Sequence, residues 1–160
     1  MNCFVSILII ALFLLNSPPI SQAQTLCAPT APDMEGPFYK PNAPIRDSTG
    51  SGLTVSGKVK SAESCAPISG ARIEWWQASP KGRYDEEHRG ALITGKDGIY
   101  RFETDYPPGY YGRPPHIHFK ILAPGHKTLT TQVYLEKGQK SISSDFVLRE
   151  EAGLGKAESN

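Results

Sequence analysis

Apolar and polar residues alternate along most of the chain after residue 52, which is the pattern of half-buried β-strands. Leu53, Val55 and Val59 are separated by polar residues and predict a strand over residues 53–60. Similar short patterns predict strands over residues 71–78, 91–94, 99–104, 116–122, 129–135 and 145–148. We interpret the charged residues 85–89 as a loop between two of these strands.

Short strands with turn signals between them, without amphipathic helices or βαβ alternation, predict an all-β fold. We expect a single-domain antiparallel β-sandwich over residues 53–150, a loop-rich N-terminal arm over 24–52 and a flexible tail over 151–160. A long helix or central strand is excluded from the arm by its prolines. These are Pro29, Pro32, Pro37, Pro41 and Pro44.

The first residues have the composition of a secretory signal. Residues 4–15 form an almost unbroken apolar run, and Ser21-Gln22-Ala23 offers small residues at the positions read by a signal peptidase. We therefore predict a signal peptide over residues 1–23, cleaved after Ala23. An uncleaved anchor is the alternative, because no Lys or Arg precedes the run. The prediction is a secreted or periplasmic protein with no membrane contact in its mature form.

Export changes how the cysteines are interpreted. Cys3 leaves with the signal, so Cys27 and Cys65 form an even pair in an oxidising compartment and predict a disulfide. The formal net charge of the chain is +1, which gives no reason to expect binding to nucleic acid. The oligomeric state is not predicted.

Two histidines one residue apart, His116 and His118, follow a turn rich in Gly and Pro. If they open a strand, its period of two places both imidazoles on one face, where they could converge on one metal ion. The alternative is a pair of half-exposed side chains without a metal. Pro114 and Pro115 restrict the backbone just before the pair, which favours a fixed site over a flexible linker.

The residues near the histidines indicate which metal would suit them. Zinc and Fe(II) sites usually add a Cys, a His or a carboxylate, whereas the candidates here are the phenols of Tyr84, Tyr110 and Tyr111. A phenol has a pKa of about 10 in water, so only a strong Lewis acid keeps it ionised at neutral pH. Two imidazoles and two phenolates around Fe(III) form a self-consistent set.

The chain resembles the intradiol ring-cleaving catechol dioxygenases from residue 27 to residue 135. The resemblance rests on five segments in order: Glu35-Gly36-Pro37-Phe38-Tyr39, residues 73–78 with Gly82-Arg83-Tyr84, residues 97–104, residues 113–119 and residues 129–134. It implies Fe(III) held by Tyr84, Tyr110, His116 and His118. Tyr110 is preferred to Tyr111 because the ligand of this family lies three residues before the arginine. Arg113 and Gln132 match pocket residues of the family.

The resemblance also implies the reaction. A catecholic substrate and O₂ would give a cis,cis-muconate-type diacid by cleavage between the two hydroxylated carbons. Tyr110 would be displaced and accept a substrate proton, Arg113 would stabilise negative charge on the substrate, and Gln132 would hydrogen-bond nearby. One alternative is a secreted β-sandwich that binds a ligand or partner and has lost the iron. A zinc or copper hydrolase using the histidine pair is the other. The sequence does not select the catechol.

Other aromatic and histidine residues carry weaker expectations. We expect Phe38 and Tyr39 to cover the core rather than line a pocket. Neighbours on a strand face opposite sides, so one of Trp75 and Trp76 is expected in the core and the other at an interface or pocket wall. His88 and His126 are expected to be surface residues, since one lies in a charged stretch and the other at a glycine turn.

Overall fold

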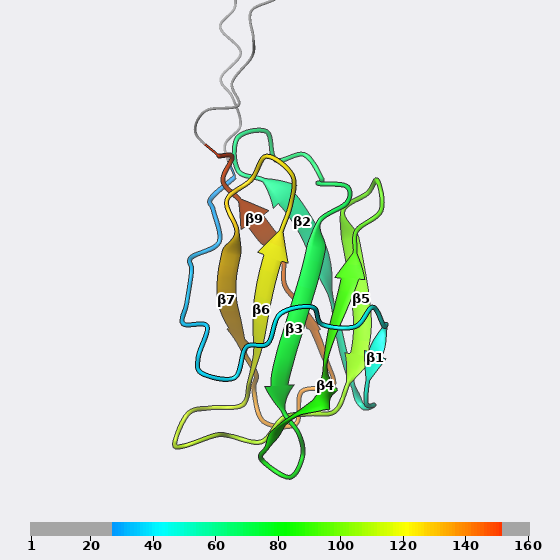
Figure 1. Ribbon diagram of the computed structural model, residues 1–160, viewed down its shortest axis with the longest axis vertical. Coiled ribbons are helices and arrows are strands. Elements are labelled where there is room, and N and C mark those ends of the chain that lie inside the picture. Colours follow the sequence, from blue (N-terminus) through cyan, green and yellow to red (C-terminus); the bar gives the residue numbers. More distant parts are fainter. Residues whose placement is uncertain (1–26, 152–160) are drawn as a thin grey trace, which may run out of the picture.

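The computed structural model describes residues 27–151, and within this range every regular element is a β-strand (Figure 1). The strands are β1 (Ser48–Thr49), β2 (Leu53–Ser61), β3 (Arg72–Ala78), β4 (Tyr84–Ile93), β5 (Ile99–Thr104), β6 (His116–Leu122), β7 (Leu129–Tyr134), β8 (Ser141–Ser143) and β9 (Phe146–Leu148). No helix able to cross a membrane occurs among these residues. The predicted signal peptide and all but the first residue of the predicted tail lie outside the described range.

The strands form two sheets, which confirms the all-β prediction. One sheet has the order β4-β3-β6-β7 and is antiparallel throughout. The other has the order β1-β5-β2-β8, with β9 also paired to β2. The expectation of purely antiparallel pairing was wrong for this second sheet, because β1 runs parallel to β5 and both β8 and β9 run parallel to β2. The last two strands return from β7 of the other sheet, so no tight hairpin forces them to be antiparallel.

The hydrophobic core lies between the two sheets. Trp75 of β3 stacks on Phe102 of β5 with ring centroids 3.9 Å apart, and Phe119 of β6 packs against Phe146 of β9 at 4.9 Å. Along β6 the odd-numbered residues Ile117, Phe119 and Ile121 are fully buried in this core. The alternation of a strand therefore turns His116, His118 and Lys120 to the opposite face of the sheet.

That opposite face is covered by the N-terminal arm, which runs across β7, β6 and β3 before reaching β1 (Figure 1). The arm is tied to the sheet by the Asp33 amide, which donates to the Thr130 carbonyl at 2.9 Å, and by a 2.8 Å ion pair between Glu35 and Lys120. Tyr39 packs on Trp76 with ring centroids 5.0 Å apart. The face of β6 that carries His116 and His118 is thus also buried, because the N-terminal arm covers it as a roof.

A buried carboxylate anchors this roof. Glu74 of β3 is 3% exposed, accepts a 2.9 Å hydrogen bond from the Tyr39 hydroxyl and pairs with the Arg72 guanidinium at 2.8 Å. Removing one partner of a buried ion pair leaves a charge without compensation. The arm is therefore held by a polar anchor as well as by packing.

Arg72→Leu is expected to lower the free energy of unfolding by about 2 kcal/mol, because the Glu74 carboxylate would stay buried without its cation. The double variant Arg72→Leu/Glu74→Gln should recover most of this loss, since the amide oxygen of Gln still accepts from Tyr39. Urea unfolding measures both values. Equal losses in the single and double variants would contradict the role assigned to the charge.

The strand boundaries were predicted well except in charged or very short segments. Residues 85–89, predicted as a loop, belong to β4, and this strand begins seven residues before the predicted one. β4 is an edge strand whose partner in the sheet is β3, and the arm bridges it only at Ala91, so charged side chains can point to solvent along its first half. The short strands β1 and β8 were not predicted, because two or three residues carry too little periodicity. The Cys27–Cys65 disulfide is present, as predicted.

Candidate metal centre

The four predicted ligands come from two strands of the four-stranded sheet and from one connection between strands, and they meet in one cavity. His116 and His118 stand at the start of β6, Tyr84 is the first residue of β4, and Tyr110 lies in the connection between β5 and β6. All four line an open cavity of about 360 Å³, together with Arg113. The fold therefore brings together side chains that are up to 34 residues apart in the sequence.

The two imidazoles are buried and oriented. His116 and His118 are 3% and 2% exposed, and their ring centroids lie 4.9 Å apart. His116 Nδ1 lies 2.7 Å from the Pro114 carbonyl oxygen, which only accepts, so Nδ1 carries the proton and Nε2 keeps its lone pair. His118 Nε2 lies 3.2 Å from the Tyr84 hydroxyl. This fixed pair confirms that the histidines share a face, and it differs from the alternative of two half-exposed side chains.

The His118 ring is held between an indole and a glycine. Trp76 stacks on it with centroids 5.0 Å apart and planes 12° from parallel. On the other side Gly36 has a φ of 73°, and a Cβ added there would lie 3.2 Å from His118 Cε1. Glycine adopts this backbone conformation without strain, so the arm can approach the ring closely. Trp75 lies in the core, and Trp76 lies on the opposite face, where it packs on His118 and lines a neighbouring pocket with Tyr39 and Arg89, as expected from strand alternation.

Burial and neighbouring charge keep both His118 and Tyr84 neutral. Burial, with smaller contributions from His116 and Arg113, lowers the pKa of His118 to about 4. Burial also raises the pKa of Tyr84 to about 12, and nearby Tyr110 adds to this rise while Arg113 opposes it. His118 therefore presents a neutral imidazole at physiological pH. Tyr84 would ionise only if a cation took the place of its proton.

Tyr84 is positioned by an irregularity in the sheet and by an aromatic neighbour. The β3–β4 register shifts between Trp76 and Ala78, so that Ala78 pairs with Tyr84 beyond a bulge. Bulges re-aim side chains and are frequent next to active sites. The Tyr84 ring stacks on Phe38 with centroids 4.3 Å apart. The expectation that Phe38 covers the core was wrong, because this side chain lines the cavity.

A tight turn separates the roles of the two neighbouring tyrosines. Tyr110 and Arg113 exchange backbone hydrogen bonds of 3.0 and 3.1 Å, and the residues between them, Tyr111 and Gly112, have φ values of 47° and 76°. Two positive φ values define the I′ type of hairpin turn. Tyr110 faces inward, edge-on to Tyr84 with centroids 5.3 Å apart. Tyr111 is 89% exposed at the tip of the turn.

A network of side-chain hydrogen bonds holds Arg113 in place. Its Nη2 donates to Gln132 Oε1 at 2.8 Å and to the Tyr134 hydroxyl. Gln132 Nε2 in turn donates to the Met34 carbonyl at 2.6 Å, which ties the arginine to the arm. Gln132 is 8% exposed and is not among the residues lining the cavity. Its contacts are those of a residue that orients Arg113.

Two residues of this network were not identified from the sequence. The Tyr134 hydroxyl also lies 3.2 Å from Asp33 Oδ2, so a carboxylate from the arm completes the chain of contacts to Arg113. Tyr134 pairs with His116 across β6 and β7, and Gln132 pairs with His118. The sequence did contain a signal for Tyr134, because the period of two along β7 places it on the same face as Gln132. Asp33 had no local signal, because the arm is irregular.

One of the two remaining histidines differs from the expectation of a surface residue. His88 is mostly buried, with 13% of its side chain exposed, between two carboxylates. His126 is half-buried, and its Nδ1 lies 2.8 Å from the Pro124 carbonyl oxygen. The surface prediction was wrong for His88, because its partner Asp105 comes from a distant segment, whereas the contact of His126 is exposed, as expected.

The donor set fits ferric iron. Two imidazoles and two phenols converge on one cavity, and phenolate oxygen is a hard donor suited to Fe(III). Within residues 27–151 no three His, Cys, Asp or Glu side chains group as a metal site. The partners of the histidine pair in this cavity are therefore phenols, and a cation is what would favour the ionised form of Tyr84.

Known proteins are similar to this chain in sequence and in fold. A family model described as a dioxygenase matches residues 111–156. The chain is 30% identical over 157 residues to chlorocatechol 1,2-dioxygenase from Cupriavidus pinatubonensis, with 77% of this chain and 61% of the relative covered. This chain thus spans about 61% of the length of that relative.

Solved structures give the same relationship. The dioxygenase domain of a dioxygenase and carbohydrate-binding protein fusion from Streptomyces sp. SirexAA-E is 35% identical, with a TM-score of 0.70, and the match covers 78% of this chain and all of that domain (100%). An intradiol ring-cleavage dioxygenase from Tetranychus urticae is 27% identical, with a TM-score of 0.65, and covers 69% of this chain and 66% of its own. Together with the cavity described above, these matches show that this chain belongs to the intradiol ring-cleavage dioxygenase family.

Proposed function

We propose that the protein is an Fe(III)-dependent intradiol dioxygenase that cleaves catecholic rings with O₂ to cis,cis-muconate-type diacids. The observation that carries the proposal is the convergence of His116, His118, Tyr84 and Tyr110 on one cavity, with Arg113 at its wall. The named activities of the relatives, catechol, chlorocatechol and hydroxyquinol 1,2-dioxygenases, support a catecholic substrate. The cavity geometry does not single out one of these rings.

His116 and His118 would hold the iron through Nε2, and Tyr84 and Tyr110 through their phenolate oxygens. Bound there, ferric iron supplies the Lewis acidity and redox character that make a catechol reactive toward O₂. Tyr84 is suited to be the permanent phenolate, because it starts a strand and is stacked on Phe38. Tyr110 lies in the connection between β5 and β6 and meets Tyr84 and Phe38 only edge-on, so its ring would be the one to move when substrate enters.

Tyr110 would also take a proton from the substrate. A phenolate oxygen that leaves its cation becomes a base again, with a pKa of about 10 in water, and can accept the proton of a catechol hydroxyl. Tyr110 Oη would thus serve both as a ligand and as the acceptor of one of the two hydroxyl protons of the catechol.

Arg113 would stabilise negative charge on the bound substrate. Its guanidinium is always protonated, and Gln132 and Tyr134 fix its direction in advance. Gln132 acts in this proposal through Arg113, since it does not line the cavity. The contact of Gln132 with Met34 links the position of the arginine to the arm that roofs the site.

We also propose that the protein acts outside the cytoplasm, as a secreted or periplasmic enzyme. The apolar run and the small residues before position 24 support a signal over residues 1–23. The Cys27–Cys65 disulfide supports an oxidising compartment, because such bonds are rare in the cytosol. N-terminal sequencing of the protein recovered from the culture medium or periplasm would test cleavage after Ala23.

The activity is tested by a visible spectrum of the purified protein before and after loading with ferric iron. A tyrosinate-to-iron charge-transfer band should appear on loading and shift when catechol is added without oxygen. Admission of oxygen should then give a muconate-type product. A protein that stays colourless after ferric loading would overturn the proposal in favour of a binding module, and stoichiometric zinc or copper would favour a hydrolase.

The turn that separates Tyr110 from Tyr111 offers a matched pair of variants. Tyr110→Phe is expected to shift or weaken the charge-transfer band and to lower turnover by at least about 100-fold, the scale of a lost acid–base group. Tyr111→Phe should leave both unchanged, because this ring borders the cavity but is 89% exposed at the tip of the turn, and the change removes only its hydroxyl. The opposite result would assign the second phenolate to Tyr111.

A further inference from the structure

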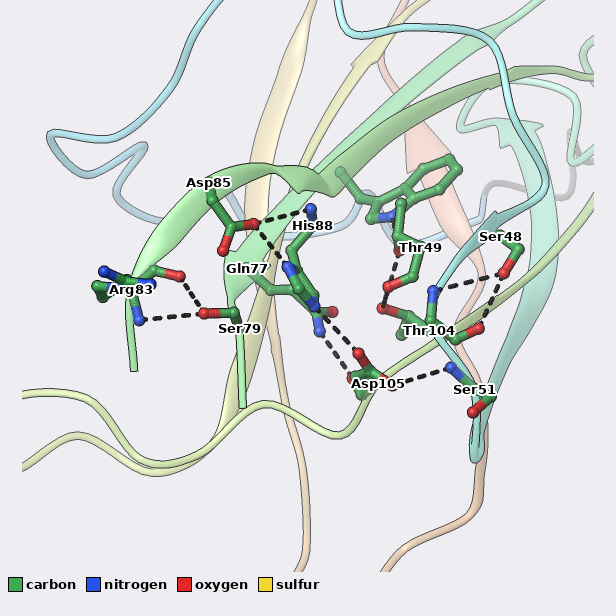
Figure 2. Close-up of polar contacts among 12 residues, drawn as sticks. Ser48, Thr49, Ser51, Gln77, Ser79, Arg83, Asp85, His88, Thr104 and Asp105 are labelled. Carbon is green, nitrogen blue, oxygen red and sulfur yellow. Dashed lines mark hydrogen bonds and ion pairs between the residues drawn. The ribbon is translucent and has the colours of Figure 1, made fainter. Parts of the chain in front are cut away.

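A second polar cluster lies at a separate surface cavity and is centred on His88 of β4 (Figure 2). His88 Nδ1 lies 2.6 Å from Asp85 Oδ1, and His88 Nε2 lies 3.1 Å from Asp105 Oδ2. The imidazole thus bridges two carboxylates that are 20 residues apart in the sequence (85 and 105). None of the three residues lines the candidate metal cavity.

The geometry requires a charged imidazole. An ionised carboxylate only accepts hydrogen bonds, so both ring nitrogens must donate and His88 must be the imidazolium. Among its neighbours, Lys81, Arg83 and Glu87 line the same surface cavity, while β3 contributes the uncharged Gln77 and Ser79. Although burial opposes it, hydrogen bonding to Asp85 and Asp105 raises the pKa of His88 above its ordinary value.

The bridge joins the two segments that carry the candidate phenols. Asp85 directly follows Tyr84 at the start of β4. Asp105 directly follows β5 and begins the connection that leads to Tyr110 and Arg113. A shift of Asp105 relative to Asp85 would therefore change the distance between the two phenols.

Asp105 is itself a firm anchor for that connection. Its Oδ1 accepts from the Ser51 amide at 3.0 Å, and its carbonyl accepts from Gln77 Nε2 at 2.7 Å (Figure 2). These contacts tie it to the β1–β2 turn and to β3. The His88 bond is the contact that ties it to β4, and it is the one of the three that depends on a proton.

We propose that protonated His88 is a positioning residue that fixes the spacing between the Tyr84 and Tyr110 segments, and that loss of its proton loosens the connection over residues 105–115. This inference rests on the proposed function for the role of the two tyrosines, but the bridge itself does not. Below the pKa of His88 both bonds are made. As the pH rises through that pKa, one ring nitrogen loses its proton and becomes an acceptor that faces a carboxylate, so its hydrogen bond is lost. When this nitrogen is Nε2, the lost bond is the one to Asp105.

The first test uses the iron-free protein, so it holds whether or not iron binds. Hydrogen exchange of the Tyr110 and Arg113 amides, the backbone-bonded amides of this connection, is corrected for intrinsic rates and compared at about pH 6 and about pH 9, on either side of the pKa range of a histidine. Protection should fall by about tenfold at the higher pH, the equivalent of one charged hydrogen bond. The turn over residues 95–98, in which the Gly98 amide donates to the Gly95 carbonyl and no histidine is present, serves as an internal control and should not change.

Two variants separate the proton from the packing of the ring. His88→Arg keeps a permanent charge with donors on both sides, and should hold protection at both pH values. His88→Gln cannot donate to both carboxylates, and should show the loosened level at both. Equal protection of the Tyr110 and Arg113 amides of the wild type at the two pH values, or a His88→Arg variant that still loosens, would overturn the bridge.

A second measurement connects the bridge to the site. The affinity for ferric iron should fall by about tenfold in His88→Gln, as is typical when a residue that orients a ligand is lost, and should be retained in His88→Arg. The charge-transfer band should shift in His88→Gln, because the phenolate spacing changes. Unaltered affinity and band in His88→Gln, with loosened exchange, would overturn the positioning role. Absence of any iron binding in wild type would instead overturn the proposed function.

Discussion

Replacing Tyr84 by phenylalanine is expected to reduce ferric-iron affinity and turnover by more than about 100-fold, beyond the range seen for residues that only support a ligand. The Tyr84 hydroxyl lies 3.2 Å from His118 Nε2, so it stands where a shared cation would be held. The phenylalanine ring keeps the stacking on Phe38, so the change removes one oxygen and leaves the wall of the cavity intact.

The measurement is a ferric titration followed by the charge-transfer band, with steady-state turnover of a catechol. Tyr106→Phe is a matched control, since it also deletes one phenolic hydroxyl, which there donates to the Glu136 carbonyl outside the cavity. The control should match the wild type in colour and turnover. A Tyr84→Phe protein with an unaltered band would show that this phenol is not a ligand.

Removal of the Cys27–Cys65 disulfide is expected to lower the free energy of unfolding by up to about 4 kcal/mol in the chain-entropy model. The bond closes a loop of 38 residues that contains the whole roof of the metal cavity. Its loss gives the unfolded chain more conformations, while the folded arm keeps the amide hydrogen bonds of Cys27, Thr30 and Asp33. The folded site should therefore survive and only the stability should fall.

Denaturant unfolding of Cys27→Ser/Cys65→Ser, compared with the wild type with and without reductant, tests this separation. Reduced wild type and the double variant should have the same lowered midpoint, and reductant should not affect the variant. Iron affinity measured in buffer should be unchanged in both. If the midpoints coincide with that of the oxidised protein, the disulfide adds nothing to stability; if iron affinity falls, the roof depends on the bond for its folded position.

The local periodicity of the sequence determined much of the scaffold. Strands with clear alternation, β2, β5 and β6, begin where they were predicted, because alternation is a property of neighbouring residues alone. The same periodicity placed His116 and His118 on one face. The residue types of Tyr84 and Tyr110 and the resemblance to a known family then named the remaining ligand candidates.

Only the tertiary structure decided what surrounds these residues. It placed the irregular arm over the histidine face, made Phe38 a cavity residue, turned Gln132 toward Arg113 and brought His88 between Asp85 and Asp105. Each of these contacts joins segments that are far apart in the chain or contain no repeat, so no local pattern encodes it. The charged start of β4 lies at a register shift between its Tyr84 and Arg89 pairs with β3, and pairing between strands is decided by the whole fold rather than by the residues of one strand.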